Sequence, residues 1–86
     1  MKLIIVAVRD IKTDVFGTPI FVNHQGAAIR SFGDQCTGTV QNADQTLMQH
    51  PEDFELYKLG EYDDNTGEFS NEKIQLAVGS NYRVKQ

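Results

Sequence analysis

The chain contains little of several residue types, and each scarcity excludes a class of protein. Its 86 residues include one cysteine, Cys36, so no internal disulfide can form and a disulfide-dependent secreted miniprotein is excluded. The longest apolar run, residues 3–8, is too short for a membrane-spanning helix or for the core of a signal peptide. We therefore expect a soluble protein of the cell interior.

Side chains that carry chemistry are also scarce. Two histidines and one cysteine, without Cys-x-x-Cys or His-x-x-x-His spacing, do not form the pattern of a zinc site. Asp63, Asn65 and Gly67 are spaced like the start of a calcium loop, but the glycine comes one position early, and a hairpin turn explains these residues better. No base or orienting group marks Cys36 as a nucleophile. We predict no metal, no cofactor and no enzymatic activity.

The length and the composition indicate one small globular domain, residues 1–86. At 40% hydrophobic and 23% charged residues the chain is not a disordered tail. A chain of this length buries only about 60–65% of the surface that its unfolded form exposes. We therefore expect a homodimer, because pairing would enlarge a small core.

The net charge of -4 hides a division along the chain. Residues 44–72 hold nine carboxylates and a single base, Lys58, whereas the two flanking segments together hold seven bases and three acids. The middle is therefore about -8 and the ends together about +4. A protein that coats nucleic acid over its whole surface is excluded, but one basic face is not.

Hydrophobic patterns predict an α+β fold with a small, mostly antiparallel sheet of four to five strands and one main helix. The apolar run at residues 2–9 indicates a central strand covered on both faces. Pro19 begins a second strand, residues 19–22, at an edge. Asn23 is the expected N-cap of a helix at about residues 24–36, with Gly38 as its terminator.

The second half of the chain predicts a short helical turn and a hairpin. Residues 44–49 form the turn ahead of Pro51. Alternation in residues 54–62 predicts a strand with Phe54, Leu56 and Tyr62 on one face and Tyr57 on the other. Residues 63–67 are rich in turn formers, and return strands follow at residues 68–70 and 73–78.

The basic ends and the aromatic residues near them point to nucleic acid, because lysine and arginine neutralise phosphates and exposed rings stack on unpaired bases. The alternative is that these are solvated strand ends and ordinary core rings. The candidate DNA-binding residues are Lys2, Arg9, Lys12, Arg30, Lys73, Arg83, Lys85, Phe16, Tyr57 and Tyr82.

Two stretches resemble a known family. They are residues 50–67, which begin His-Pro-Glu-Asp and end in an acidic turn with Thr-Gly, and residues 26–32, Gly-Ala-Ala-Ile-Arg-Ser-Phe, preceded by Pro19-Ile20-Phe21. Together they resemble the small non-structural protein of gokushovirus-type microviruses, which are bacteriophages with single-stranded DNA genomes. Only Arg30 is a base within the matched helix motif.

The resemblance implies a protein of the infected bacterium's cytoplasm that is not a capsid component. It also implies DNA binding during genome replication or packaging. Our leading hypothesis is a homodimer that binds single-stranded DNA without sequence preference. The alternative is a non-enzymatic interaction module that engages a phage or host protein through its acidic region, residues 44–72, because such a surface repels DNA and attracts a basic partner.

Overall fold

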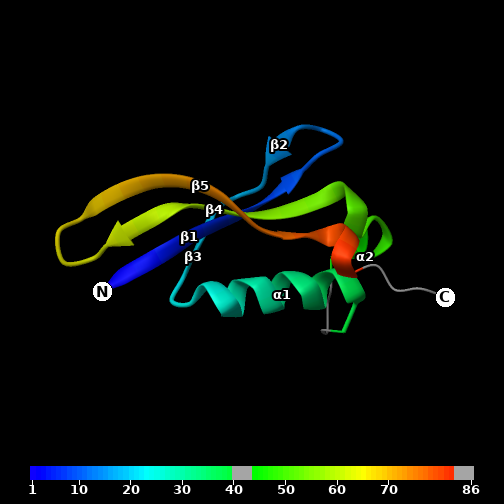
Figure 1. Ribbon diagram of the computed structural model, residues 1–86, viewed down its shortest axis with the longest axis horizontal. Helices are drawn as coiled ribbons and strands as arrows, with labels where there is room; N and C mark the ends of the chain where they lie inside the picture. The colour runs from blue at the N-terminus through cyan, green and yellow to red at the C-terminus, as the bar shows by residue number, and fades with distance from the viewer. Residues whose placement is uncertain (40–43, 83–86) are drawn as a thin grey trace.

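The computed structural model describes residues 1–39 and 44–82, and these form one antiparallel sheet with helices on one side (Figure 1). The strands are β1 (Lys2–Asp10), β2 (Val15–Phe16), β3 (Ile20–Val22), β4 (Phe54–Asp63) and β5 (Glu68–Val78). Within the described residues the order across the sheet is β2 or β3, then β1, β4 and β5. This arrangement confirms the predicted fold class, while the dimer remains a prediction.

β1 is central, as its apolar run predicts, but only one of its faces is covered by helix. Its even-numbered apolar residues, Ile4, Val6 and Val8, pack in the core between the sheet and α1. Leu3 and Ile5 point to the other side and are half-buried. The expectation of cover on both faces was wrong because side chains of neighbouring strands, not a second layer, shield the other face.

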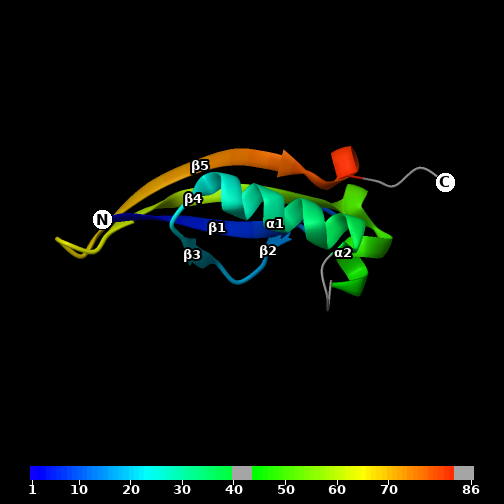
Figure 2. The same cartoon turned by 90° about the horizontal axis from the view of Figure 1, so that it is seen from below.

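The main helix, α1 (Gln25–Thr37), lies along one face of the sheet (Figure 2). Its buried residues are Ala28, Phe32, Gly33 and Cys36. Gly38 ends the helix with a positive φ of 73°, as expected. The N-cap residue is His24 and makes no side-chain cap bond, so the expectation that Asn23 caps the helix was wrong.

Short helices close one end of the molecule. The predicted turn ahead of Pro51 is α2 (Gln45–Gln49), and the Asp44 carboxylate caps it by accepting bonds from the backbone N–H groups of Thr46 and Leu47. Two 3-10 helices, η1 (Pro51–Asp53) and η2 (Gly79–Tyr82), precede β4 and follow β5. Among the described helices, none is long and apolar enough to cross a membrane.

The β4–β5 hairpin is longer than predicted and contains a bulge. β5 is one continuous strand of 11 residues, and the hairpin extends past the N-terminal end of α1 (Figure 1). On β4 the pairing with β1 slips by one residue, because Ile5 lies opposite Gly60 and Val6 lies opposite Lys58. Gly60 has a φ of 154°, a conformation that side-chain-bearing residues rarely adopt.

Candidate nucleic-acid interface

The side of the sheet opposite α1, which we call the helix-free face, carries most of the aromatic rings. All eight rings of the chain lie in the described residues, and three of them, Phe32, Phe54 and Tyr82, belong to the core under α1. The other five form two ring groups on the helix-free face: Phe16 and Tyr57, and Phe21, Tyr62 and Phe69.

The larger ring group is a triad of side chains from β3, β4 and β5. The centroids of Tyr62 and Phe69 are 4.8 Å apart, and Phe21 lies 5.8 Å from Tyr62 and 6.4 Å from Phe69. Phe21 is 50% exposed and Phe69 is 64% exposed. Large apolar side chains at this exposure offer a contact surface rather than core packing.

Strand register explains why the triad forms. Phe21 is opposite Ile5 on β1, while Tyr62 is opposite Leu3 on β1 and Phe69 on β5. These residues therefore share one face of adjacent strands, where side chains directly opposite lie close enough for rings to touch.

The smaller ring group is an aromatic pair that lies beside two basic residues. Phe16 and Tyr57 meet edge to face with centroids 5.5 Å apart, and the Lys73 ammonium lies 5.5 Å from the Phe16 centroid. Arg9 lies opposite Phe16 in the sheet. Phe21 of the triad pairs with Ile5 on β1, and Phe16 pairs with Arg9 on the same strand. These two β1 residues are four positions, or about 13 Å, apart.

Carboxylates hold Arg9 in place. Its guanidinium donates to Asp14 at 2.6 Å and to Glu55 at 3.3 Å. The hydrogen bond to Asp14 raises the pKa of Arg9 above its ordinary value, with a smaller contribution from Glu55. Glu55 also accepts bonds from the Tyr57 hydroxyl and from Gln75. Arg9 is therefore oriented on the helix-free face, and part of its charge is neutralised there.

The other candidate site residues do not gather with Arg9. Lys2 is exposed at the start of β1 opposite Asp63, and Lys12 is exposed in the turn between β1 and β2. Arg30 is exposed on α1, which covers the opposite face of the sheet. Arg83 and Lys85 lie outside the described residues.

Tyr82, another candidate, is not on the helix-free face. Its ring meets the buried Phe32 ring edge to face at 6.0 Å and packs against the core. It also fills the space where a side chain at position 33 would stand, so Gly33 permits the contact. Of the three candidate rings, Phe16 and Tyr57 share the helix-free face and Tyr82 closes the core.

Three rings of the helix-free face, Phe21, Tyr62 and Phe69, are absent from the site predicted from sequence. The alternation of β4 places Tyr62 with Phe54 and Leu56, on the core side. The bulge at Gly60 reverses this, because one extra residue turns the following side chains to the other face. The available signal was Gly60 itself, since a glycine inside a strand pattern often marks a bulge.

The acidic middle of the chain is divided among local contacts. Lys58, whose side chain is 11% exposed, is held by Glu61 at 3.2 Å and Glu72 at 3.4 Å, and the hydrogen bond to Glu61 raises its pKa. Asp64 accepts a bond from the amino group of Met1 at 2.8 Å. With Asp44 at the helix cap and Glu55 on Arg9, five carboxylates of the acidic middle are engaged in separate local contacts.

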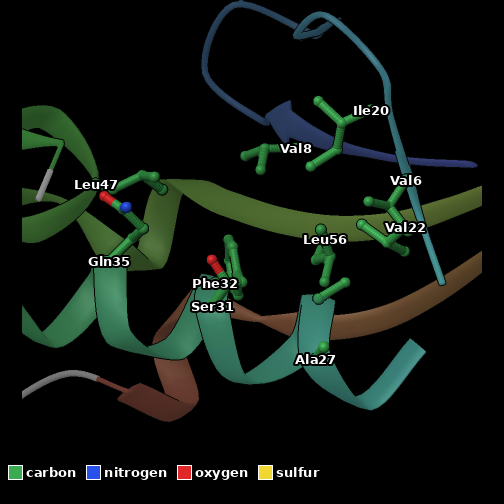
Figure 3. Close-up of a pocket in the computed structure, with 11 residues that line it drawn as sticks. Val6, Val8, Ile20, Val22, Ala27, Ser31, Phe32, Gln35, Leu47 and Leu56 are labelled. Carbon is green, nitrogen blue, oxygen red and sulfur yellow. The ribbon is translucent and has the colours of Figure 1, made fainter. Parts of the chain in front are cut away.

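An apolar pocket of about 210 Å³ opens on the other side of the sheet, between α1, β1, β3 and α2 (Figure 3). Its wall is almost entirely aliphatic, with Ser31 and Gln35 of α1 as the polar side chains. The Gln35 amide oxygen accepts a bond from the backbone N–H of Asp44 at 2.6 Å. The pocket is therefore an unfilled flank of the core, and nothing ionisable lines it.

A model of the family described as "Phage ORF5 protein" matches residues 3–82. The chain belongs to this phage protein family. No curated protein and no solved structure matches the chain.

The match with the phage family spans the whole described sheet except the first residue of β1. It includes both ring groups together with Arg9 and Lys73, and it ends before Arg83. A phage protein fits the expectation from the sequence resemblance. The assignment to microviruses and the binding of DNA remain predictions.

Proposed function

We propose that this phage protein binds single-stranded DNA without sequence preference on its helix-free face. The observation that carries the proposal is the placement of two ring groups beside Arg9 and Lys73 on that face. Aromatic side chains on a sheet, combined with bases that follow the phosphate backbone, are the usual means of binding unpaired strands.

Stacking supplies most of the binding energy in this proposal. Each base stacked on a ring contributes about 1–3 kcal/mol, and any base can stack because each has an aromatic face. The most exposed rings, Phe69 and Phe21, accept bases first. Ile5 and Arg9, the β1 residues opposite Phe21 and Phe16, are roughly 13 Å apart, so one DNA strand can span both ring groups.

Phosphate contacts contribute less. Arg9 and Lys73 are the bases beside the rings, and the protein is acidic overall. Two neutralised phosphates give a slope of about -1.4 in log K against log salt, since single strands lose roughly 0.7 per phosphate. Binding is therefore expected to be weakly salt-dependent.

The family and the sequence resemblance support a role in the infected bacterium. We propose that the protein acts in the host cytoplasm, outside the capsid, while the genome of a microvirus is replicated or packaged. The alternative, capture of a basic protein by residues 44–72, has less support because five of the nine carboxylates of that region are engaged in separate local contacts.

The experiment is a fluorescence-anisotropy titration of a labelled oligothymidine of about 16 nucleotides, the upper end of common site sizes. Salt is varied from about 50 to 200 mM. The expected result is saturable binding with the shallow slope given above. A duplex of the same length is expected to bind more weakly, because its bases are already stacked. Absence of binding at the lowest salt would overturn the proposal.

Two matched pairs of variants locate the site. Lys73→Gln and Arg30→Gln remove the same charge from the helix-free face and from α1, and we expect only the first to weaken binding. Phe21→Ala and Ile20→Ala truncate neighbouring, similarly exposed residues of β3 that point to opposite sides. Only Phe21→Ala should weaken binding, by about 5-fold or more. Equal losses within either pair would place the DNA elsewhere.

A further inference from the structure

The outer edge of β5 is long and unpaired. β5 has 11 residues, and no strand in residues 1–39 and 44–82 pairs with its outer side. The opposite edge is interrupted, because β2 has two residues, β3 has three, and Pro19 precedes β3. An edge strand presents a row of free backbone N–H and C=O groups that a second strand can pair with.

The first part of β5 contains no proline, and its side chains keep one alternation although its pairing with β4 shifts register between Asn71 and Ile74. Phe69 and Gln75 lie opposite Tyr62 and Tyr57, and Lys73 lies over Phe16, so these side chains point to the helix-free face. Glu72 reaches Lys58 on the other side. The side chains therefore alternate without interruption over residues 68–75, a segment long enough to form a stable ladder with another strand.

We propose that two copies of this chain pair through the edges of β5, antiparallel, around a two-fold axis at Asn71. The occupant is a second copy because the segment is complementary to itself in this register. A two-fold interface of this kind uses the same surface of both copies and closes after two.

Charge excludes three neighbouring registers. In an antiparallel pair around a two-fold axis, each residue lies opposite the one equally distant from the axis on the other side. An axis at Ser70 places Glu68 opposite Glu72, and an axis at Glu72 or at Lys73 places that residue opposite itself. Like charges directly opposite each other are destabilising. An axis at Asn71 avoids all three conflicts.

The Asn71 register also creates favourable pairs. Phe69 of each copy lies opposite Lys73 of the other, so an ammonium meets an exposed ring twice across the interface. Ser70 lies opposite Glu72, where a hydroxyl can donate to a carboxylate. Asn71 lies opposite its own copy, where two amides can exchange hydrogen bonds.

The proposed pairing joins the two sheets into one continuous surface. The axis is perpendicular to the sheet, so both helix-free faces lie on the same side and both α1 helices lie on the other. Lys73 of each copy then stands between its own Phe16 and Phe69 of the second copy. The interface itself does not depend on DNA binding.

The experiment is disulfide cross-linking of the full chain. Asn71→Cys places two thiols opposite each other with Cα atoms about 4.5–5.5 Å apart, within the range of a disulfide. Gln75→Cys on the same face of β5 is the matched control, because its two copies are eight residues or about 26 Å apart in this register. Cys36 is 2% exposed and does not compete.

Under mild oxidation Asn71→Cys is expected to form a reducible covalent dimer, whereas Gln75→Cys remains monomeric on a denaturing gel. Light scattering of the unmodified chain should give twice its 9.7 kDa. A monomeric mass, or cross-linking of Gln75→Cys as fast as Asn71→Cys, overturns the proposed interface. Either outcome leaves DNA binding to be measured separately, so the two proposals fail independently.

Discussion

Replacing Gly60 tests the feature that turns Tyr62 toward the helix-free face. Gly60 has a φ of 154°, and a Cβ at this position would overlap the carbonyl oxygen of Ser70 on β5. Gly60→Ala must therefore both strain the backbone and displace the neighbouring strand. We expect it to be the most destabilising of the glycine-to-alanine changes compared below.

The expected loss has two sources. Holding alanine in a region of positive φ costs about 1–3 kcal/mol. Forcing an extra methyl group into a packed site costs about 1–3 kcal/mol more. The total of roughly 2–6 kcal/mol is a large part of the stability of an 86-residue domain, and about 4 kcal/mol corresponds to a fall in Tm of roughly 15 °C or more.

Two other glycines serve as matched controls. Gly67 has a φ of 75°, but a Cβ there meets no atom within 4 Å, so Gly67→Ala is expected to cost only the strain of about 1 kcal/mol. Gly26 lies in α1 with equally open space, and Gly26→Ala should stabilise the protein by up to about 1 kcal/mol.

The measurement is urea unfolding followed by far-ultraviolet circular dichroism. From most to least stable, we expect Gly26→Ala, the unmodified chain, Gly67→Ala and then Gly60→Ala. A Gly60→Ala variant as stable as Gly67→Ala would refute the described bulge and the assignment of Tyr62 to the helix-free face.

The remaining predictions concern charge, the thiol and an exposed ring. Asp14→Asn keeps a residue that tolerates the φ of 56° at position 14 but removes the carboxylate that pairs with Arg9. The freed Arg9 should raise the affinity for oligothymidine by up to about 5-fold in the anisotropy titration. An unchanged affinity contradicts a phosphate contact by Arg9. Burial raises the pKa of Cys36 from 9.0 to about 11, so at about pH 8 a thiol reagent should label it only as fast as the chain opens. Because the unfolded thiol ionises first, stability measured by urea unfolding should fall as pH rises from 9.0 toward 11; immediate labelling or constant stability contradicts this burial. Phe21→Ser should weaken oligothymidine binding with little change in the urea midpoint, since the ring is 50% exposed; a large loss of stability would show that the ring is structural.

Local patterns were sufficient to predict most of the fold. The apolar run of β1 and the glycine at position 38 each act over a few neighbouring residues, and the central strand and the helix end that they predict agree with the structure. The missing helix layer over one face of β1 could not be read in this way. An apolar run has the same appearance whether a second layer or neighbouring aromatic side chains shield it.

The site was harder to predict because it depends on register. Phe16 and Tyr57 were among the candidates, but their contact needs β2 and β4 to flank β1, which sequence alone does not show. Strict alternation along β4 places Tyr62 on the wrong face because a one-residue bulge reverses every later side chain. Tyr82 follows a strand near bases, yet its ring closes the core through the gap at Gly33.

The central claim, that single-stranded DNA lies on the helix-free face, is tested most directly by aromatic NMR shifts during titration with an oligothymidine. We expect resonances of the rings on that face to move: Phe16, Phe21, Tyr57, Tyr62 and Phe69. Phe32, Phe54 and Tyr82 in the core should remain in place. Shifts confined to the three core rings, or no shifts at saturating oligonucleotide, would contradict the account.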